Sequence, residues 1–155
     1  MAIISTRFDS PIGALRLCAE HGRLCALDIG EGAAAGGDAN PDDPLLREAV
    51  AQLAAWFDGR LTDFTLPLAP AKTPRGPAHR DAIVAIGFGE TASYGAIARA
   101  IGSSPRAVGQ ACARNPLPIL VPCHRVLGAG GTIGHYSAGA GIPTKRWLLS
   151  HEKGC

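Results

Sequence analysis

The residues best suited to covalent chemistry stand together late in the chain, where Cys123 is followed by His124 and Arg125. A thiolate is a strong nucleophile, and a neighbouring imidazole or guanidinium favours it over the thiol. The triplet therefore predicts a reactive cysteine. Taken alone, a cysteine is more often a small buried apolar residue, so the residues around Cys123 must decide between these two interpretations.

The other cysteines carry no comparable signal. The five cysteines are scattered and odd in number, which is not typical of a disulfide framework and favours a reducing compartment. Three of them are interpreted as buried apolar residues: Cys18, Cys112 and Cys155. Cys18 and Cys25 flank an expected two-residue turn, which would place them opposite each other on adjacent strands. With His21 or His79 they form a weak zinc candidate, but the spacing is not that of a standard finger, and we assign no metal site.

Positive charge is concentrated in the C-terminal part of the chain. The net charge is +2, but residues 1–90 hold eight Lys and Arg against twelve Asp and Glu, whereas residues 91–155 hold seven against one. Clustered basic residues gain affinity for polyanions by releasing counterions from phosphates. The asymmetry favours a polyanionic partner, and a solvated basic surface accounts for it about equally well.

Length and hydropathy limit the class of protein. A chain of 155 residues, 46% hydrophobic, can bury about two-thirds of its unfolded surface as one compact unit. Its longest apolar runs, 83–86 and 117–121, are far shorter than the roughly 20 residues that cross a bilayer, and its first residues do not resemble a signal peptide. We therefore expect a soluble, monomeric, cytoplasmic protein.

The elements that must position the reactive residues begin with a small sheet. Apolar patterning and turn residues predict three antiparallel strands, over 3–8, 14–19 and 23–29. The small polar residues of 31–42 have no periodicity and are expected to form a mobile linker. A helix follows over 44–58, with Asp43 as its N-cap. The irregular, proline-rich residues 60–76 lead to a second part, with the boundary near Thr73.

The second part is expected to be mainly helical. A helix over 77–86 and a turn at 87–89 precede two short helices, 94–101 and 105–113, which are separated by residues 102–104. This arrangement is typical of a helix-turn-helix, although antiparallel helix pairs are common. The last of these helices carries unusually small side chains: Ala107, Gly109, Ala111 and Ala113. Little bulk suits either the shallow minor groove of DNA or close packing on a neighbouring helix, and the residues alone leave both open.

Around Cys123 the sequence resembles a known family. Pro122-Cys-His-Arg-Val126 is similar to the active-site signature of the O6-alkylguanine-DNA alkyltransferases. Further segments follow that family's order and nearly its spacing: Asp9-Ser-Pro-Ile-Gly13, Tyr94-Gly-Ala-Ile-Ala98, Arg106-Ala-Val-Gly109, Arg114-Asn-Pro-Leu-Pro118, Tyr136-Ser137 and Lys145-Arg-Trp-Leu-Leu149. The resemblance covers most of the chain and is densest from Gly89 to Glu152.

The resemblance implies an α+β fold in two domains. Residues 1–73 would form a ribonuclease-H-like domain with a small antiparallel sheet and a helix, and residues 74–155 a mostly helical DNA-binding domain with the active site. It implies DNA repair by direct reversal, in which Cys123 takes a methyl or larger alkyl group from O6 of guanine, or O4 of thymine, in a nucleotide flipped out of double-stranded DNA. A thioether has no easy reverse reaction, so each molecule acts once. The transfer requires no metal or organic cofactor.

The resemblance also implies roles for individual residues. Cys123 is the alkyl acceptor, His124 is a base acting through a bridging water, and Glu152 holds the imidazole. Five residues would contact DNA: Tyr94 at the 3′ phosphate, Arg106 in place of the extruded base, and Ala107, Gly109 and Arg114 at the second helix. Four would form the substrate pocket: Pro118, Val126, Tyr136 and Ser137. Two would support the turn before an extended strand that carries the cysteine: Asn115 and Arg125.

Two segments depart from the family's pattern. Arg75-Gly-Pro-Ala-His79-Arg80 stands where the family has a Phe-Gln pair, an apolar residue and Trp, so the helix that normally packs the two parts together lacks an aromatic anchor. The loop from Tyr136 to Lys145 is about two residues longer than usual. Because this loop is expected to form a wall of the pocket, its length predicts a wider pocket that tolerates alkyl groups larger than methyl.

Two other classes of function compete with alkyl transfer. An alkyltransferase-like protein that binds and shields the lesion would lack the acceptor cysteine, whereas Cys123 is present. A Cys-His hydrolase would need an oxyanion pocket, which the sequence does not locate, and it would turn over many substrates per molecule.

Overall fold

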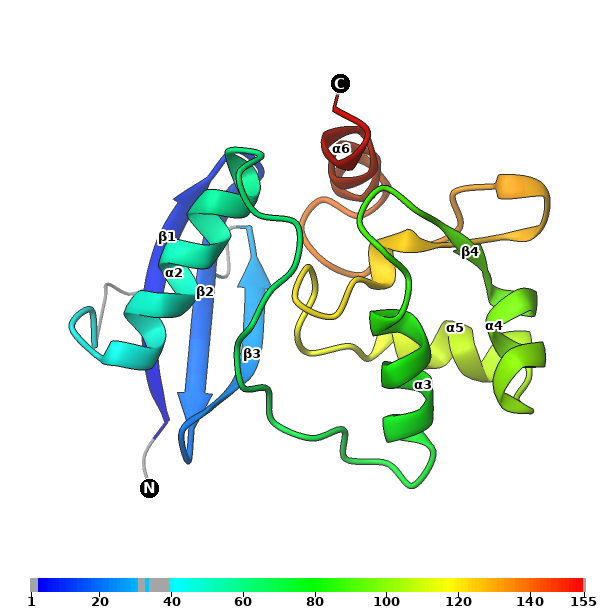
Figure 1. Ribbon diagram of the computed structural model, residues 1–155, viewed down its shortest axis with the longest axis horizontal. Helices are drawn as coiled ribbons and strands as arrows, with labels where there is room; N and C mark the ends of the chain where they lie inside the picture. Colours follow the sequence, from blue (N-terminus) through cyan, green and yellow to red (C-terminus); the bar gives the residue numbers. More distant parts are fainter. Residues whose placement is uncertain (1–2, 31–32, 34–39, 155) are drawn as a thin grey trace. The chain divides into compact units, whose positions relative to one another are not determined.

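Three antiparallel strands open the chain, each within two residues of its predicted ends. The computed structural model describes residues 3–30, 33 and 40–154. The strands β1 (Ile4–Ser10), β2 (Gly13–Glu20) and β3 (Arg23–Ile29) form one sheet in the order β1-β2-β3 (Figure 1). Alternate residues of β2 are buried, as expected for a sheet with one face in a core: Leu15, Leu17 and Ala19.

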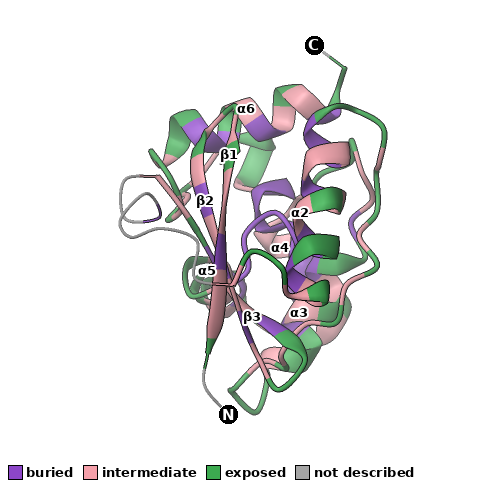
Figure 2. Cartoon of the chain, turned by 90° about the vertical axis from the view of Figure 1, so that its left-hand side faces the viewer, coloured by how far each residue is buried: buried purple, intermediate pink, exposed green. Residues whose placement is uncertain are grey.

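The helix α2 (Pro44–Phe57) covers this sheet within the same part of the chain. Asp43 is its N-cap, because its side chain accepts the Leu46 N–H at 3.1 Å, and Pro44 lies in the first turn, where no backbone donor is needed. Buried residues recur at helical spacing, and exposed residues lie between them (Figure 2): Leu46, Ala49, Leu53, Trp56 and Phe57 are buried. The helix contacts β1 and β2, so its apolar stripe and the buried face of the sheet form one core.

The turn between β2 and β3 corrects one interpretation of the sequence. His21 and Gly22 both take a left-handed φ, of 55° and 74°, as a tight two-residue turn requires. A bulge after Cys18 shifts the register, so Cys18 pairs with Ala26 and not with Cys25. Within the described part of the chain, no three His, Cys, Asp or Glu residues lie close enough together to hold a metal ion.

The remainder of the chain is mainly helical. Its elements are α3 (Gly76–Val84), β4 (Ala92–Ser93), α4 (Tyr94–Ile101), α5 (Pro105–Ala113), η1 (Cys123–Arg125), β5 (Val126–Leu127), η2 (Ala129–Gly131) and α6 (Ile142–Glu152). The bounds of α4 and α5 are those predicted, and α3 begins one residue early and ends two residues early. Parallel pairing of β4 with β5 joins the start of α4 to the end of η1 (Figure 1).

The chain divides into two compact units, Met1–Ala69 and Pro70–Cys155. Most of the expected linker over 31–42 lies outside the described residues, and so does Cys155. Asn40, near the end of that stretch, is fixed to β1, because Ser5 N donates to its Oδ1 at 3.1 Å and its own N–H donates to Ser5 O at 3.0 Å. Among the helices of the described residues, none has the length and apolar character needed to cross a membrane.

Candidate active site

Cys123 begins a short 3₁₀ turn, which corrects the expectation that an extended strand carries it. The segment before it folds back on itself, because Val121 N donates to Leu117 O at 2.8 Å and Cys123 N donates to Val121 O at 2.7 Å. Within this loop Ile119 takes a left-handed φ of 73°, which is costly for a β-branched residue and persists only where the surroundings enforce it. Residues 117–126 are all buried, and their packing supplies that constraint.

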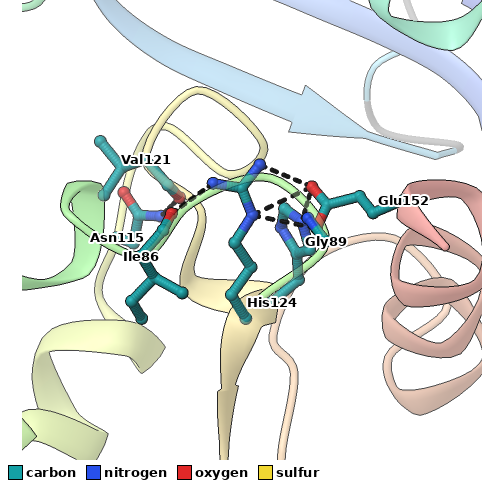
Figure 3. Close-up of polar contacts among 7 residues, drawn as sticks. Ile86, Gly89, Asn115, Val121, His124 and Glu152 are labelled. Carbon is teal, nitrogen blue, oxygen red and sulfur yellow. Dashed lines mark hydrogen bonds and ion pairs between the residues drawn. The ribbon is translucent and has the colours of Figure 1, made fainter. Parts of the chain in front are cut away.

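The side chain of Asn115 holds this loop and the sulfur together. Its Nδ2 donates to Val121 O at 2.9 Å and to Cys123 Sγ at 3.2 Å, and its Oδ1 accepts the Leu117 N–H at 3.0 Å. Figure 3 shows Asn115 beside Val121. The sequence placed Asn115 at the turn, but its direct contact with the sulfur was not predicted.

Glu152, the last residue of α6, binds the two side chains of η1 that follow the cysteine (Figure 3). His124 Nε2 lies 2.9 Å from Glu152 Oε2, and Arg125 Nη2 lies 2.7 Å from the same oxygen. Gly89 N donates to Glu152 Oε1 at 3.3 Å, and Arg125 Nη1 donates to Ile86 O at 2.6 Å. Because the three side chains are buried, this is a closed polar network that ties η1 to α6 and to the turn after α3.

Burial and pairing set the charge state of this network. Burial alone would raise the pKa of Glu152, but the hydrogen bonds from His124 and Arg125 outweigh it and lower the pKa to about 2. Burial also lowers the pKa of His124 below its usual 6.5, against the opposing hydrogen bond to Glu152. At neutral pH the pair is a carboxylate and a neutral imidazole. Since a carboxylate only accepts hydrogen bonds, the imidazole proton lies on Nε2 and the basic nitrogen is Nδ1.

The two side chains expected to activate Cys123, those of His124 and Arg125, do not supply a free positive charge to it. Arg125 is paired with Glu152, and His124 is neutral. Burial raises the pKa of Cys123, and three influences lower it: the hydrogen bond from Asn115, the positive charge of Lys145 and a hydrogen bond from the backbone of Cys123 itself. The cation that acts on the thiol is therefore distant in the sequence, and the two neighbours of the cysteine were the wrong source of charge.

Lys145, on α6, is completely buried. Its Nζ donates to Val126 O at 2.7 Å and to His135 O at 3.2 Å, and it lies 5.9 Å from the centroid of the Tyr94 ring. A buried ammonium group persists only with such partners. In the sequence it is merely the first residue of a segment shared with the family, and no local pattern indicates that a lysine there is buried.

A pocket opens beside Cys123. The empty space in it is about 260 Å³, a value that includes space open to solvent. The pocket is lined by Tyr94, Gly109, Cys112, Ala113, Cys123, His135, Tyr136 and Ser137. Pro118 and Val126 are buried and do not line it, so their assignment to the pocket stays a prediction. Cys112 is only partly buried and lies in the pocket wall, which corrects its interpretation as a core residue.

Comparison with known proteins places this arrangement in a family. A family model described as the DNA binding domain of 6-O-methylguanine DNA methyltransferase matches residues 78–154, and one described as its ribonuclease-like domain matches residues 3–70. The chain belongs to the 6-O-methylguanine DNA methyltransferase family. The fold is the α+β fold that the resemblance implied.

Relatives of similar length match almost the whole chain. The methylated-DNA–protein-cysteine methyltransferase of Methanosarcina acetivorans is 39% identical, covering 96% of this chain and 97% of its own. The constitutive methylated-DNA–protein-cysteine methyltransferase of Bacillus subtilis is 36% identical, covering 96% and 94%. A crystal structure of Mycobacterium tuberculosis OGT in complex with DNA matches with a TM-score of 0.82 at 42% identity, covering 97% of this chain and 92% of that one.

The helix pair of this methyltransferase-family chain has a well-formed turn. Gly102 ends α4 with a left-handed φ of 65°, and Ser104 caps α5 by accepting the Ala107 N–H at 3.1 Å. Arg106, in the first turn of α5, and Arg114, directly after its last residue, are exposed. Both arginines are therefore accessible to an external partner.

Two small residues of α5 line the pocket, a role that differs from both alternatives drawn from the sequence, the minor groove of DNA and close packing on a neighbouring helix. Val108 is completely buried, and α5 contacts α3 and α4. Gly109 and Ala113 instead border the pocket. Their small size leaves space beside Cys123, which larger side chains at these positions would fill.

The segment at 75–80 that departs from the family makes polar contacts with the turn between α4 and α5. His79 is buried, and its Nε2 lies 2.8 Å from Ser103 Oγ. Arg75 Nη2 donates to the two carbonyls at the C-terminal end of α4, at 3.3 and 3.4 Å. Within this unit, polar side chains on α3 and at its N-terminus contact the helix-turn-helix, and the loss of an aromatic anchor relative to the family stays a prediction.

The lengthened loop forms a hydrogen-bonded turn before α6. Ala140 N donates to Thr144 Oγ1 at 2.9 Å, and Gly141 N donates to Ala138 O at 3.0 Å. Of this loop, only Tyr136 and Ser137 line the pocket. The other residues of the loop do not line the pocket, and both the extra length and the tolerance of large alkyl groups stay predictions.

Proposed function

We propose that this protein repairs DNA by taking a methyl or larger alkyl group from O6 of guanine onto Cys123. The observation that carries the proposal is that Cys123 lies in the wall of an open pocket. The next residue, His124, is a buried neutral imidazole that is hydrogen-bonded to Glu152. The family to which the chain belongs, and the names of its relatives, support alkyl transfer from DNA.

The chain's own residues account for each step of the transfer. The Cys123 thiol proton moves through a bridging water to His124, and Glu152 stabilises the resulting imidazolium. The sulfur attacks the alkyl carbon, the bond between that carbon and O6 breaks, and the departing guanine keeps the electron pair. Guanine takes up one proton from solvent, and the imidazolium returns its proton to solvent. The thioether has no easy reverse reaction, so each molecule acts once. O4 of thymine offers the same chemistry and is a second substrate candidate.

The substrate would be a nucleotide flipped out of double-stranded DNA. We assign Arg106 to the gap left in the stack and Tyr94 to the 3′ phosphate, with α5 in the minor groove. The other DNA contacts proposed are Ala107, Gly109 and Arg114. The base would enter the pocket of Tyr136 and Ser137, with Pro118 and Val126 behind it, while Asn115 and Arg125 keep the cysteine loop in place.

We assign the ribonuclease-H-like domain to residues 1–73 and the DNA-binding domain to residues 74–155, and we infer a monomeric protein of the cytoplasm. The division of the chain after Ala69 and the family matches at 3–70 and 78–154 support this assignment. Size-exclusion chromatography with light scattering measures the oligomeric state.

The reaction is tested by mixing the purified protein with DNA that contains O6-methylguanine and following intact mass. We expect the protein to gain one methyl group on Cys123, located by peptide mapping, and the reaction to stop at one equivalent. Cys123→Ala loses the transfer and still binds the lesion. Cys112→Ala, which removes the other thiol of the pocket, keeps the methylation on Cys123.

Two outcomes would contradict the proposal. An unmodified Cys123 with persistent binding to the lesion would identify a non-catalytic damage-binding protein. Release of many product molecules per protein would identify a hydrolase.

A further inference from the structure

The proposed reaction leaves one buried polar group of the pocket unused, the hydroxyl of Tyr136. Its oxygen is shielded from solvent and has no hydrogen-bond partner among the described residues. The other tyrosine of the pocket differs, because Tyr94 has a hydrogen bond with the backbone of His135. Leaving a buried hydroxyl without a partner costs free energy, and nearly all buried polar groups in proteins have one. A partner for Tyr136 is therefore expected in the working protein.

The candidate partner is the sulfur of Cys123, which lines the same pocket. Asn115 Nδ2, at 3.2 Å, is the one side-chain donor to this sulfur that the described residues show. An anionic sulfur accepts more than one hydrogen bond, and bonds to an ionised group are stronger than bonds between neutral groups. The sulfur thus needs a further donor when its proton leaves.

The charge state of Tyr136 suits it to this task. Burial raises the pKa of its phenol, and the negative charge of Cys123 raises it further. The phenol therefore keeps its proton while the thiolate forms, and it is a donor throughout the reaction.

The backbone around Tyr136 is held on both sides. Lys145 Nζ donates to the carbonyl of the preceding residue, His135, at 3.2 Å. After it, Ala138 O accepts the Gly141 N–H at 3.0 Å. The backbone that carries Tyr136 in the pocket wall is therefore held in place.

We propose that the Tyr136 hydroxyl donates a hydrogen bond to the Cys123 sulfur as the thiolate forms. No bond to Tyr136 is made or broken, and the interaction weakens once the sulfur becomes a neutral thioether. The inference rests on the proposed role of Cys123 as the alkyl acceptor and adds a second donor beside Asn115. Other titratable groups around the sulfur are Cys112 on α5, Tyr94 on α4, Lys145 on α6 and His135, which precedes Tyr136 in the pocket wall.

The test is the pH dependence of Cys123 alkylation by iodoacetamide in the wild type and in Tyr136→Phe, with peptide mapping to separate Cys123 from the other thiols. Phe keeps the ring and removes only the hydroxyl. We expect the midpoint of the Phe variant to rise by about one pH unit and its rate at neutral pH to fall about three- to tenfold. An unchanged midpoint and rate would show that Tyr136 is only a wall of the pocket.

A second arm needs no substitution in the gene. The chain contains two tyrosines, and replacing both with fluorotyrosine during expression makes each hydroxyl a stronger donor. We expect the midpoint for Cys123 to fall, in the direction opposite to Tyr136→Phe, and no fall would overturn the inference. Because iodoacetamide requires no DNA, a pH shift without methyl transfer would sink the proposed function and spare the hydrogen bond. Methyl transfer without a pH shift would do the reverse.

Discussion

Two cations contribute to the surroundings of Cys123, and they act differently. Arg125 is two positions away in the sequence, but its charge is balanced by Glu152 at 2.7 Å. Lys145 is 22 positions from Cys123, and no carboxylate is paired with it among the described residues. Its positive charge is directed instead at two carbonyls and the thiols of the pocket.

The contribution of Lys145 is tested by Lys145→Met, which keeps most of the side-chain volume and removes the charge. We expect the pKa of Cys123 to rise and its alkylation by iodoacetamide to slow about tenfold at neutral pH, since a change of one pKa unit in a nucleophile changes its thiolate fraction tenfold. Rates measured across a pH series separate this effect from a general loss of reactivity.

The matched control for that substitution is Arg146→Met. Arg146 is the next residue of α6 and is exposed, so its removal lowers the charge of the chain by the same amount without emptying the site. Equal slowing in both variants would show that net charge, and not the buried ammonium, sets the reactivity of Cys123.

At the scale of elements, local signals in the sequence located most of the fold. The turn at His21 and Gly22, and the cap at Asp43, rest on interactions between residues close in the chain, and so the elements beside them were predicted within two residues. The helix α6 was not predicted. Its buried face consists of Thr144, Lys145, Leu148 and Glu152, so apolar periodicity, the usual sign of a helix, is absent.

The 3₁₀ turn at Cys123 was missed for a related reason. The apolar, proline-containing segment before it has the composition of an extended strand, and its reversal depends on the left-handed φ of Ile119. That conformation is enforced by tertiary burial and by Asn115, not by local preference. Sequence patterns predicted that the reactive residues lie in one region. The hydrogen-bond partners of their side chains could be identified only from the structure.

The hydrogen bond between His79 and Ser103, called the polar clamp below, joins α3 to the turn of the helix-turn-helix. A double-mutant cycle of His79→Ala and Ser103→Ala tests it. We expect a coupling free energy of about 0.5–1.5 kcal/mol, because the two side chains share one partly buried hydrogen bond. Unfolding in urea measures it. We also expect weaker binding to DNA in both single variants, because Ser103 lies in the turn that orients α5.

The reactivity of Cys123 toward iodoacetamide is the control for this cycle, and it should not change, since neither residue lines the pocket. Additive effects on stability would mean that His79 merely fills space. Altered thiol reactivity would mean that the clamp also supports the active site.

At the scale of the whole molecule, the Glu152 network links stability to pH. The pKa of Glu152 in the fold is about 2, below its ordinary 4.5, so its pairing stabilises the fold above pH 4.5 and this contribution is lost as the pH falls toward 2. The pKa of His124 is also lowered in the fold, so the unfolded chain takes up that proton first and stability declines below pH 6.5. Both effects destabilise the protein in acid.

The substitution Glu152→Gln tests the contribution of Glu152 to the pH dependence of stability. We expect it to lower the free energy of unfolding by about 3–5 kcal/mol at neutral pH, because it leaves a buried guanidinium without its carboxylate. The difference from the wild type narrows between pH 4.5 and 2, where the native carboxylate itself is protonated. Urea unfolding at a series of pH values measures this.

The exposed Glu90 supplies the comparison, as Glu90→Gln removes a carboxylate of the same unit from the surface. We expect little change in stability at any pH for this variant. A gap between the wild type and Glu152→Gln that stays constant down to pH 2 would contradict the linkage.

The position of Glu152 in the chain also affects the order in which the active site is assembled during synthesis. Gly89, His124 and Arg125 precede it by 63, 28 and 27 residues. Because the ribosome makes protein from the N-terminus, the nucleophile and its imidazole are made before the carboxylate that orients them. A nascent chain therefore carries Cys123 without the proposed proton relay, and the contact between His124 and Glu152 forms only when the last turn of α6 has been made and has docked.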